Sequence, residues 1–292
     1  MKVGFLGLGH MGTPMAVRLL STGHELHVYN RTSSAADPLV KKGARQALQP
    51  SDLNECEILI TMLADDVAVE SVVYGEKGLL GALKSGALHV SMSTISPALA
   101  ERMEKDHQAK GCALVGAPVF GRPDAAAAGK LFVMAGGSQE NLNRCSSILE
   151  TLSQKVFHVS PKPALAHLTK VLGNFMLLSS VQILSESLAL AHKSGLDQAQ
   201  FLEAITGSLF SAPLYKNYGG MIIDQLYDKK VAFRLPLALK DIRLAKQAAD
   251  SVGSPLPSAS LVHDQIITAI ARGMKDMDLS ALGKLASDNS GI

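Results

Sequence analysis

The first 160 residues alternate short apolar runs with segments of helical periodicity. Runs typical of buried strands occupy residues 2–6, 25–29, 57–62, 87–92, 113–116 and 131–135. A helical pattern extends from Pro14 to Leu20, and Gly23 follows it as a C-cap. Because strands separated by helices indicate βαβ units, we predict an α/β fold with a largely parallel sheet in this part of the chain.

The pattern changes near Pro161 and Pro163, after which almost no alternating segment occurs and long helical patterns take over. The stretch from Ala164 to Gly195 is apolar on every face and would form a helix of roughly 45 Å. Such a helix must be covered on all sides, either by other helices or by a second subunit. We therefore predict two domains, 1–162 and an all-helical 163–292.

Composition excludes several classes of function. The net charge is +2 and the basic residues are scattered, which argues against binding to nucleic acid or to a membrane surface. Three separated cysteines, Cys56, Cys112 and Cys145, predict neither a disulfide framework nor a metal site. We recognise no signal peptide and no membrane span, so we expect a cytoplasmic protein.

Three glycines follow the first strand with the spacing GxGxxG. Gly7 would allow a tight turn, Gly9 would let a pyrophosphate approach the backbone, and Gly12 would let the next helix pack closely on the strand. The N-terminus of that helix would hold the phosphates. A tight turn without a ligand is the alternative, but the position between two predicted strands favours a dinucleotide site.

The end of the second strand indicates which dinucleotide is bound. An NAD site usually has an acidic residue there, whereas this chain has Asn30, Arg31 and Thr32. Arg31 can pair with the 2′-phosphate of NADPH, and Thr32 can donate a further hydrogen bond. We therefore predict NADPH over NADH, with a solvated surface charge as the alternative for Arg31.

A second candidate site lies on the long predicted helix. Lys170 and Asn174 are four residues apart, so they project from one face. A partly desolvated lysine can exchange a proton near neutral pH. The alternative, on the spacing alone, is a lysine that extends along the helix to reach solvent.

Seven segments together carry a resemblance to a known family. They are Gly7-Leu8-Gly9-His10-Met11-Gly12, Asn30-Arg31-Thr32, Met62-Leu63-Ala64-Asp65, Ser93-Thr94-Ile95-Ser96-Pro97, Ala117-Pro118-Val119 with Gly121, Lys170 with Asn174, and Phe233 with Lys240-Asp241. In this order they resemble the β-hydroxyacid dehydrogenase family, which includes 3-hydroxyisobutyrate dehydrogenase, tartronate semialdehyde reductase and glyoxylate/succinic semialdehyde reductases. The resemblance extends over nearly the whole chain.

The resemblance implies a Rossmann-type domain, an all-helical second domain, and a long interdomain helix that helps to form a homodimer or homotetramer. It makes Lys170 the general acid that protonates the carbonyl oxygen as hydride arrives, and Asn174 the residue that orients the substrate and Lys170. Besides the turn at 7–12 and Asn30-Arg31-Thr32, it assigns to the cofactor Leu63, Ala64, Ala68, Thr94 and Lys240. For the substrate it points to Ser93, Phe120, Gly121, Arg122, Phe233 and Asp241.

The chain departs from the family pattern where the substrate is held. The family loop usually reads Asp-Ala-Pro-Val-Ser-Gly-Gly, and this chain has Gly-Ala-Pro-Val-Phe-Gly-Arg at residues 116–122. Phe120 removes a hydroxyl donor, so we expect the usual carboxylate cradle to be absent. Arg122 either replaces that cradle or faces solvent. Ser91, where an aspartate is common, should matter little.

Ala164 and Ala166 replace the glycines that normally open the catalytic helix, so its first turn is expected to approach the ligand less closely.

The leading hypothesis is an NADPH-dependent oxidoreductase that acts on an aldehyde, a keto acid or the matching β-hydroxy acid. A reductase of C=N bonds is the first alternative, because Phe120 favours less polar substrates, although imine reductases typically lack the lysine. A catalytically silent dinucleotide-binding protein is the second.

Overall fold

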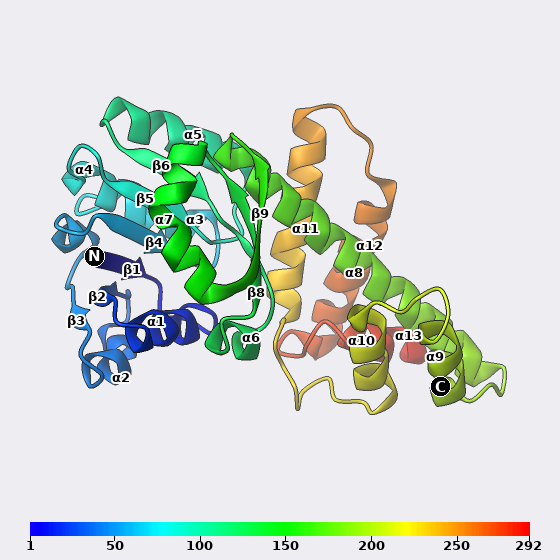
Figure 1. Cartoon of the computed structure of the whole chain (residues 1–292). Coiled ribbons are helices and arrows are strands. Elements are labelled where there is room, and N and C mark those ends of the chain that lie inside the picture. Colours follow the sequence, from blue (N-terminus) through cyan, green and yellow to red (C-terminus); the bar gives the residue numbers. More distant parts are fainter. The chain divides into compact units, whose positions relative to one another are not determined.

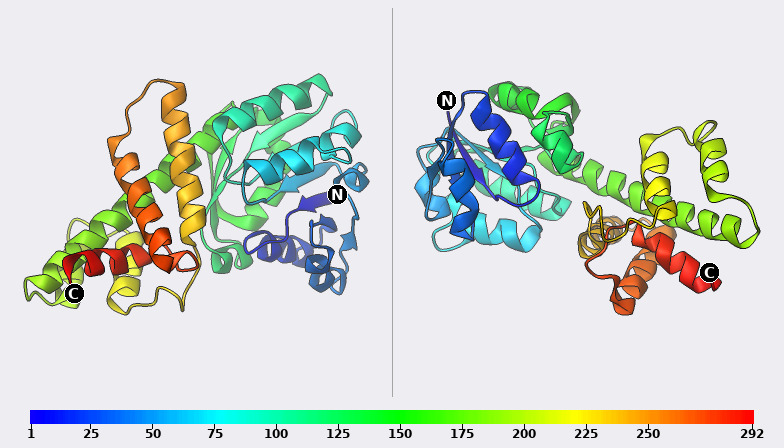
Figure 2. Two further views of the ribbon diagram at one scale, coloured as in Figure 1. Left: turned by 180° about the vertical axis from the view of Figure 1, so that it is seen from behind. Right: turned by 90° about the horizontal axis from the view of Figure 1, so that it is seen from below.

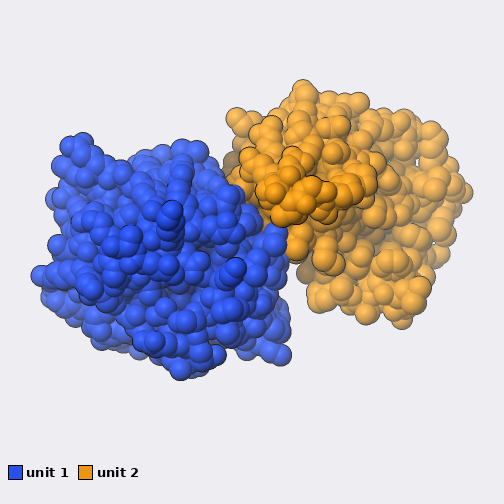
Figure 3. Space-filling model, turned by 90° about the horizontal axis from the view of Figure 1, so that it is seen from above, with its two compact units in different colours: residues 1–170 blue, residues 171–292 orange.

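The computed structural model describes residues 1–292, which form two compact units, Met1–Lys170 and Val171–Ile292 (Figures 1 and 3). The division falls within helix α8 (Pro163–Lys193), because the start of this helix packs with the first unit and the rest with the second. The domain boundary predicted at residue 162 lies directly before this helix and stays a prediction.

Unit 1 is built on one nine-stranded sheet with the order β3-β2-β1-β4-β5-β6-β8-β7, with β9 paired to β8. Its strands are β1 (Lys2–Leu6), β2 (Glu25–Tyr29), β3 (Arg45–Gln46), β4 (Ile58–Thr61), β5 (Leu88–Ser91), β6 (Ala113–Gly116), β7 (Val119–Phe120), β8 (Leu131–Gly136) and β9 (Ser153–Ser160). Strands β1 to β6 pair in parallel, whereas β8 runs antiparallel to β6 and β7. The predicted parallel sheet is confirmed.

Helices cover both faces of this sheet (Figure 1). They are α1 (Gly12–Ser21), α2 (Asp37–Val40), α3 (Asp66–Tyr74), α4 (Leu79–Ala82), α5 (Pro97–Ala109), α6 (Pro123–Ala127) and α7 (Gln139–Leu152), with 3-10 turns η1 (Ser33–Ala36) and η2 (Pro50–Leu53). Side chains alternate along β1, so Phe5 packs in the cluster that includes α1 and α7, whereas Leu6 packs with residues of η2 and α4. Fully buried parallel strands of this kind read as continuous apolar runs.

Unit 2 is helical, as predicted (Figure 2). After α8 come α9 (Gln198–Thr206), α10 (Pro213–Ile223), α11 (Leu235–Ser251), α12 (Pro257–Ala269), η3 (Ile270–Met274) and α13 (Ala281–Ser290). Its core joins Leu178 and Val181 of α8 to Leu235 and Ile242 of α11. An isolated bridge between Arg234 and Asp278 is its one β-type pairing.

One face of α8 is not covered within the chain. Leu172, Met176, Ile183 and Leu190 are 43, 67, 64 and 67% exposed, and the last three are spaced by seven residues along one helical stripe. By length and mean hydropathy alone α8 would also qualify as a membrane span, a property that it shares with long core helices of soluble proteins. Within this chain, other helices thus cover only part of α8, and the predicted covering by a second subunit stays a prediction.

Candidate active site

The three glycines of the first turn perform different tasks in the structure. Gly7 has φ +106°, and a Cβ atom there would overlap the carbonyl oxygen of Met62. A Cβ atom on Gly12 would overlap the carbonyl oxygen of Gly7, so the helix and the turn are in direct backbone contact. Nothing lies within 4 Å of the position that a Cβ atom on Gly9 would take. Gly7 and Gly12 thus serve the fold, while Gly9 leaves open space beside the backbone.

Helix α1 begins directly after this turn with an uncapped end. No side chain caps its N-terminus, and its first turn holds no acidic residue. The turn is fixed instead by Thr13, whose hydroxyl donates to the Leu8 carbonyl at 2.9 Å and whose N–H donates to the Gly9 carbonyl at 3.0 Å. The positive end of the helix therefore faces exposed backbone at Gly9 and His10, as an anion site requires.

Asn30 joins the end of β2 to the glycine turn. Its Oδ1 accepts a 2.9 Å hydrogen bond from the Leu8 N–H, and its Nδ2 donates to the Thr32 carbonyl at 3.0 Å. Arg31 and Thr32 are exposed next to it, and Arg31 forms no ion pair within the protein. The amide of Asn30 is thus used in holding the loop, while the guanidinium of Arg31 stays available.

The loops after β4 and β5 meet at the same edge of the sheet. Ser93 is fully buried, and its Oγ accepts from the Leu63 N–H at 2.8 Å and donates to the Thr61 carbonyl at 3.4 Å. The hydroxyl predicted to touch substrate therefore links the two loops. Ala68 donates its N–H to Asp65 Oδ1 at 2.8 Å at the start of α3.

Of the remaining residues predicted to line the cofactor path in these loops, Ala64 is exposed and Thr94 half-buried. Leu63 also approaches the glycine turn, because its Cδ2 lies 2.8 Å from the position of a Cβ atom on Gly7. The loops after β1, β4 and β5 therefore lie together at the carboxyl edge of the sheet. This edge is where open α/β sheets bind ligands.

Lys170 and Phe120 come together although they are 50 residues apart in the sequence. Lys170 is 9% exposed, and its Nζ lies 4.0 Å from the centroid of the Phe120 ring. Phe120 ends the short strand β7 and is half-buried. Gly121 has φ +141° and follows it, and Arg122, also half-buried, precedes α6. Phe120, where the predicted substrate loop departs from the family pattern, therefore contacts the predicted general acid.

The first turn of α8 lies close to the sheet. A Cβ atom on Gly116 would lie 2.5 Å from the Pro163 carbonyl oxygen, and one on Gly136 would lie 2.9 Å from the Ala166 Cβ. Ala164 and Ala166 are both buried in this contact. The close approach between the sheet and the first turn of α8 thus depends on glycines in the sheet. The helix itself has alanines at the positions where the family has glycines.

Sequence reasoning missed a group of buried histidines near this turn. His89 Nε2 lies 2.9 Å from Thr61 Oγ1, His89 Nδ1 lies 3.0 Å from His107 Nε2, and His107 Nδ1 lies 2.7 Å from the Met103 carbonyl oxygen. Because that carbonyl only accepts, His107 Nδ1 must carry a proton, His89 Nδ1 must donate to His107, and Thr61 must donate to His89. Burial lowers the pKa of both histidines, so both imidazole rings of this hydrogen-bonded series are neutral.

His167 lies one helical turn before Lys170 and is fully buried. Neither ring nitrogen has a hydrogen bond of normal geometry. Burial lowers the pKa of this imidazole to about 3, and the nearby Ser93 backbone offsets only part of the effect. His167 is therefore a neutral ring that packs against Gly116.

In unit 2, three predicted residues form one polar cluster. Asn174 Nδ2 donates to Asp241 Oδ2 at 2.5 Å, and Lys240 Nζ lies 2.9 Å from Asp241 Oδ1. Asp241 is 3% exposed, so its charge is compensated inside the protein. Phe233, the fourth predicted residue of this unit, donates its backbone N–H to Asp278 Oδ2 at 2.9 Å.

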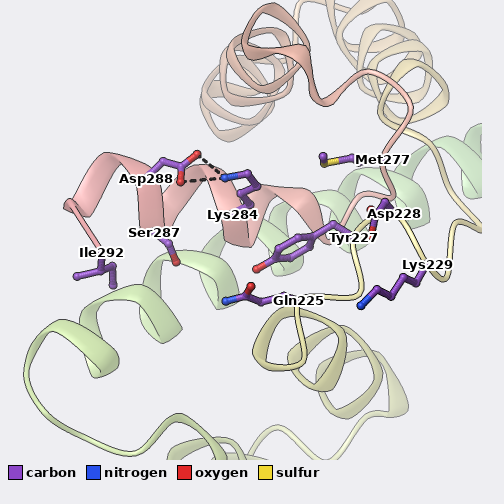
Figure 4. Close-up of a pocket in the computed structure, with 9 residues that line it drawn as sticks. All are labelled: Gln225, Tyr227, Asp228, Lys229, Met277, Lys284, Ser287, Asp288 and Ile292. Carbon is purple, nitrogen blue, oxygen red and sulfur yellow. Dashed lines mark hydrogen bonds and ion pairs between the residues drawn. The ribbon is translucent and has the colours of Figure 1, made fainter.

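Unit 2 also has a hollow of about 460 Å³ beside the C-terminus (Figure 4). It is lined by Gln225, Tyr227, Asp228, Lys229, Met277, Lys284, Ser287, Asp288 and Ile292. Lys284 and Asp288 pair across one helical turn at 3.1 Å. None of the residues predicted for the cofactor or the substrate lines this hollow, so it is separate from the candidate active site.

Comparison with known proteins covers both units. The NAD binding domain of 6-phosphogluconate dehydrogenase matches residues 2–160, and the NAD-binding domain of NADP-dependent 3-hydroxyisobutyrate dehydrogenase matches residues 165–286. An uncharacterized oxidoreductase of Bacillus subtilis is 41% identical over 285 residues, which is 97% of this chain and 99% of the relative. The NAD-dependent L-serine dehydrogenase of Pseudomonas aeruginosa is 31% identical over 99% of both chains.

A solved structure has a similar fold over nearly the whole chain. The 3-hydroxyisobutyrate dehydrogenase of Mycobacterium tuberculosis, solved with L-serine, aligns with a TM-score of 0.88 at 27% identity and covers 97% of this chain and 98% of that one. The family domains match in the order and at the positions where the glycine turn and Lys170 lie. This chain therefore belongs to the β-hydroxyacid dehydrogenase family and is an NAD(P)-dependent oxidoreductase that acts on CH–OH groups.

Proposed function

We propose that this enzyme uses NADPH to reduce an aldehyde or keto acid, and in the reverse direction oxidises the matching β-hydroxy acid, with Lys170 as general acid and base. The observation that carries the proposal is the burial of Lys170, which is only 9% exposed and lies against an aromatic ring. Long cationic side chains rarely give up solvent unless they are paired or functional.

The chain fits a dinucleotide at the glycine turn. The open space beside Gly9 and the uncapped start of α1 would hold the pyrophosphate, while Leu63, Ala64, Ala68 and Thr94 would line the path toward the nicotinamide. The cofactor supplies the hydride when it is bound. In this proposal the turn and the loops after β4 and β5 bind and orient it.

Arg31 supports NADPH as the preferred form. The Pseudomonas aeruginosa relative is named as NAD-dependent, so the family alone does not decide between the cofactors. In this chain no acidic residue ends β2, the Asn30 amide is engaged with the turn, and Arg31 is an exposed cation without an internal partner. A 2′-phosphate would supply that partner through charge-assisted hydrogen bonds.

Lys170 would supply the proton. Hydride addition to a carbonyl carbon leaves negative charge on the oxygen, and a positioned ammonium neutralises it by donating a proton. Asn174 lies one helical turn further along α8, and Asp241 fixes its amide through Nδ2. Asn174 would therefore orient the substrate with an amide whose rotation is restrained.

The experiment compares Lys170→Ala with Lys162→Ala, a matched change at an exposed lysine just before the same helix. Turnover with NADPH should fall by a factor of about 10² to 10⁴ in the first variant, the usual contribution of a general acid. The dissociation constant for NADPH should change by less than about twofold, because Lys170 is proposed to act in the chemical step and not in cofactor binding. A Lys170→Ala enzyme with more than a tenth of wild-type turnover would disprove the role.

A panel of aldehydes, keto acids, β-hydroxy acids and cyclic imines, each assayed with NADPH and NADH, tests the rest. Activity on imines alone would support the C=N alternative that Phe120 favours. Tight NADPH binding without turnover on any compound would support a silent binding protein. Preferential turnover of carbonyl compounds with NADPH supports the proposal.

We also propose that the enzyme is a homo-oligomer that covers the exposed stripe of α8. Met176, Ile183 and Leu190 form a row of apolar side chains that one chain leaves in water. Light scattering should give the mass of a dimer or tetramer. Ile183→Glu should shift it to the monomer, and a monomeric wild-type protein would contradict the proposal.

A further inference from the structure

We infer that, within the substrates of the proposed function, Phe120 makes this site prefer aldehydes whose remaining substituent is uncharged and apolar over keto acids and other carbonyl compounds that carry a carboxylate. The inference rests on the proposed function, because it concerns the substrate that meets Lys170. The substrate class inferred differs from the one expected for the usual family loop, in which a serine and neighbouring N–H groups hold a carboxylate. The contact between Lys170 and the Phe120 ring is the observation that carries it.

The backbone fixes the position of Phe120. Strand β7 is held to β8 by the register pairs Val119 with Val133 and Phe120 with Phe132. Gly121 follows with φ +141°, and a Cβ atom there would lie 2.6 Å from Leu131 Cδ2. The strand pairing and the close packing at Gly121 thus hold the backbone that carries the Phe120 ring.

The ring itself disfavours an anion for electrostatic reasons. The face of an aromatic ring carries partial negative charge, which attracts an ammonium at 4.0 Å but repels a carboxylate. Phe120 also offers no hydrogen-bond donor, so a carboxylate placed against it would lose water without compensation. An alkyl or aryl group in the same place would instead gain from leaving water.

Arg122 is the residue that could reverse this selectivity. It lies two residues after Phe120, directly before α6, and is half-buried. If its guanidinium anchored a carboxylate, the enzyme would prefer acidic substrates despite Phe120, and Arg122→Ala would abolish that preference. The inference predicts instead that Arg122→Ala leaves the ranking of charged and uncharged substrates unchanged.

The turnover experiment uses succinic semialdehyde and its methyl ester, which differ in charge at one end. The wild-type enzyme should have a kcat/KM for the ester at least tenfold above that for the acid. Phe120→Ser should reverse this order. Phe132→Ser is the matched control, because Phe132 is the cross-strand partner on β8 and stacks on Phe157 at 6.4 Å, and it should keep the wild-type order.

Phe120→Leu separates the aromatic face from apolar bulk. It should keep the preference for the ester, since leucine is also apolar and offers no donor. The ring face stabilises the charged form of an amine, so its removal should make the rate of reduction fall at a lower pH than in the wild-type enzyme. An unchanged pH profile would mean that the ring acts only through its size.

A binding experiment distinguishes failure of this inference from failure of the proposed function. Butyramide and butyrate have nearly the same shape and differ in charge, and their dissociation constants for the protein saturated with NADP⁺ need no turnover. Butyramide should bind at least tenfold more tightly to the wild-type protein, and Phe120→Ser should favour butyrate. Tighter binding of butyrate to the wild-type protein would overturn the inference, whether or not any substrate is turned over.

Discussion

The side-chain amide of Asn174 donates a 2.5 Å hydrogen bond to the buried carboxylate of Asp241, 67 residues away in the sequence. Lys240 lies 2.9 Å from the other oxygen of the same carboxylate. Helices α8 and α11 are thus joined by a charged group that is shielded from water. The proposed substrate-orienting residue depends on this contact for its own orientation.

Asp241→Ala should weaken both stability and turnover. It leaves a buried amide and a nearby ammonium without their acceptor, which should lower the free energy of unfolding by about 2–3 kcal/mol. Asp288→Ala removes a carboxylate from an exposed pair with Lys284, so it should cost less than about 0.5 kcal/mol. Urea unfolding followed by circular dichroism measures the free energy of unfolding of both variants. Equal losses would show that the buried contact stabilises the protein no more than the exposed pair does.

Replacing Arg31 should change the choice of cofactor. Arg31→Ala should raise the KM for NADPH by a factor of about 10 or more, because charge-assisted hydrogen bonds contribute about 1.5–3 kcal/mol. The KM for NADH should stay within about twofold, since the adenosine ribose of that cofactor carries a 2′-hydroxyl and no phosphate. Arg45→Ala, at a 69% exposed arginine on the neighbouring strand β3, is the control and should alter neither value. Parallel losses for the two cofactors would refute a role in recognising the 2′-phosphate.

Two glycines of the turn should respond differently to the same substitution. Gly9→Ala meets open space, so the unfolding free energy should change by less than about 0.5 kcal/mol while NADPH affinity falls at least tenfold. Gly12→Ala forces a methyl group onto the Gly7 carbonyl and should cost about 1–3 kcal/mol of stability as well. Gly81→Ala, with no neighbour within 4 Å, serves as the control. Calorimetric titration and thermal unfolding together test this, and normal NADPH binding by Gly9→Ala would contradict it.

The buried His167 should make the protein sensitive to acid. Its pKa is about 3 in the folded chain against 6.5 in the unfolded chain, so the unfolded state binds more protons between these values. Stability is therefore fully present above pH 6.5 and falls as the pH drops toward 3. His167→Leu should reduce the slope of unfolding free energy against pH in this window by up to about 1.4 kcal/mol per unit.

The same variant should be at least as stable as the wild-type protein at pH 8, because it removes a buried imidazole whose nitrogens have no hydrogen bond of normal geometry. His192→Leu, at an exposed position near the end of the same helix, should leave the slope unchanged. Superimposable pH curves for the wild type and His167→Leu would show that this ring is not protonated on unfolding.

Much of the fold could be read from local pattern. Strands β1 and β2 occupy the residues predicted, since β1 is an almost fully buried apolar run that ends at Gly7, and β2 is a short run with buried side chains at alternate positions. Strand β9 was missed because most of its side chains are exposed and no apolar run marks it. The short β7 escaped for a different reason, because two residues are too few for any periodicity.

The candidate site was harder to read where contacts are distant in sequence. The glycine turn could be recognised because its three residues lie within one loop. Phe120 was recognised as unusual, yet nothing in the sequence shows that its ring meets Lys170. The link between His89 and His107 is also tertiary, because two isolated histidines on a strand and a helix give no local signal.

The contact between Gly7 and Gly12 has a consequence for how such a chain would drift during evolution. A descendant that no longer bound a dinucleotide would still need glycine at both positions, because its own backbone atoms occupy the space of any side chain. Gly9 would be released, since only a bound ligand competes for the space beside it. A relative that has replaced Gly9 but retained the glycines corresponding to Gly7 and Gly12 would thus be expected to keep the fold and no longer bind the cofactor.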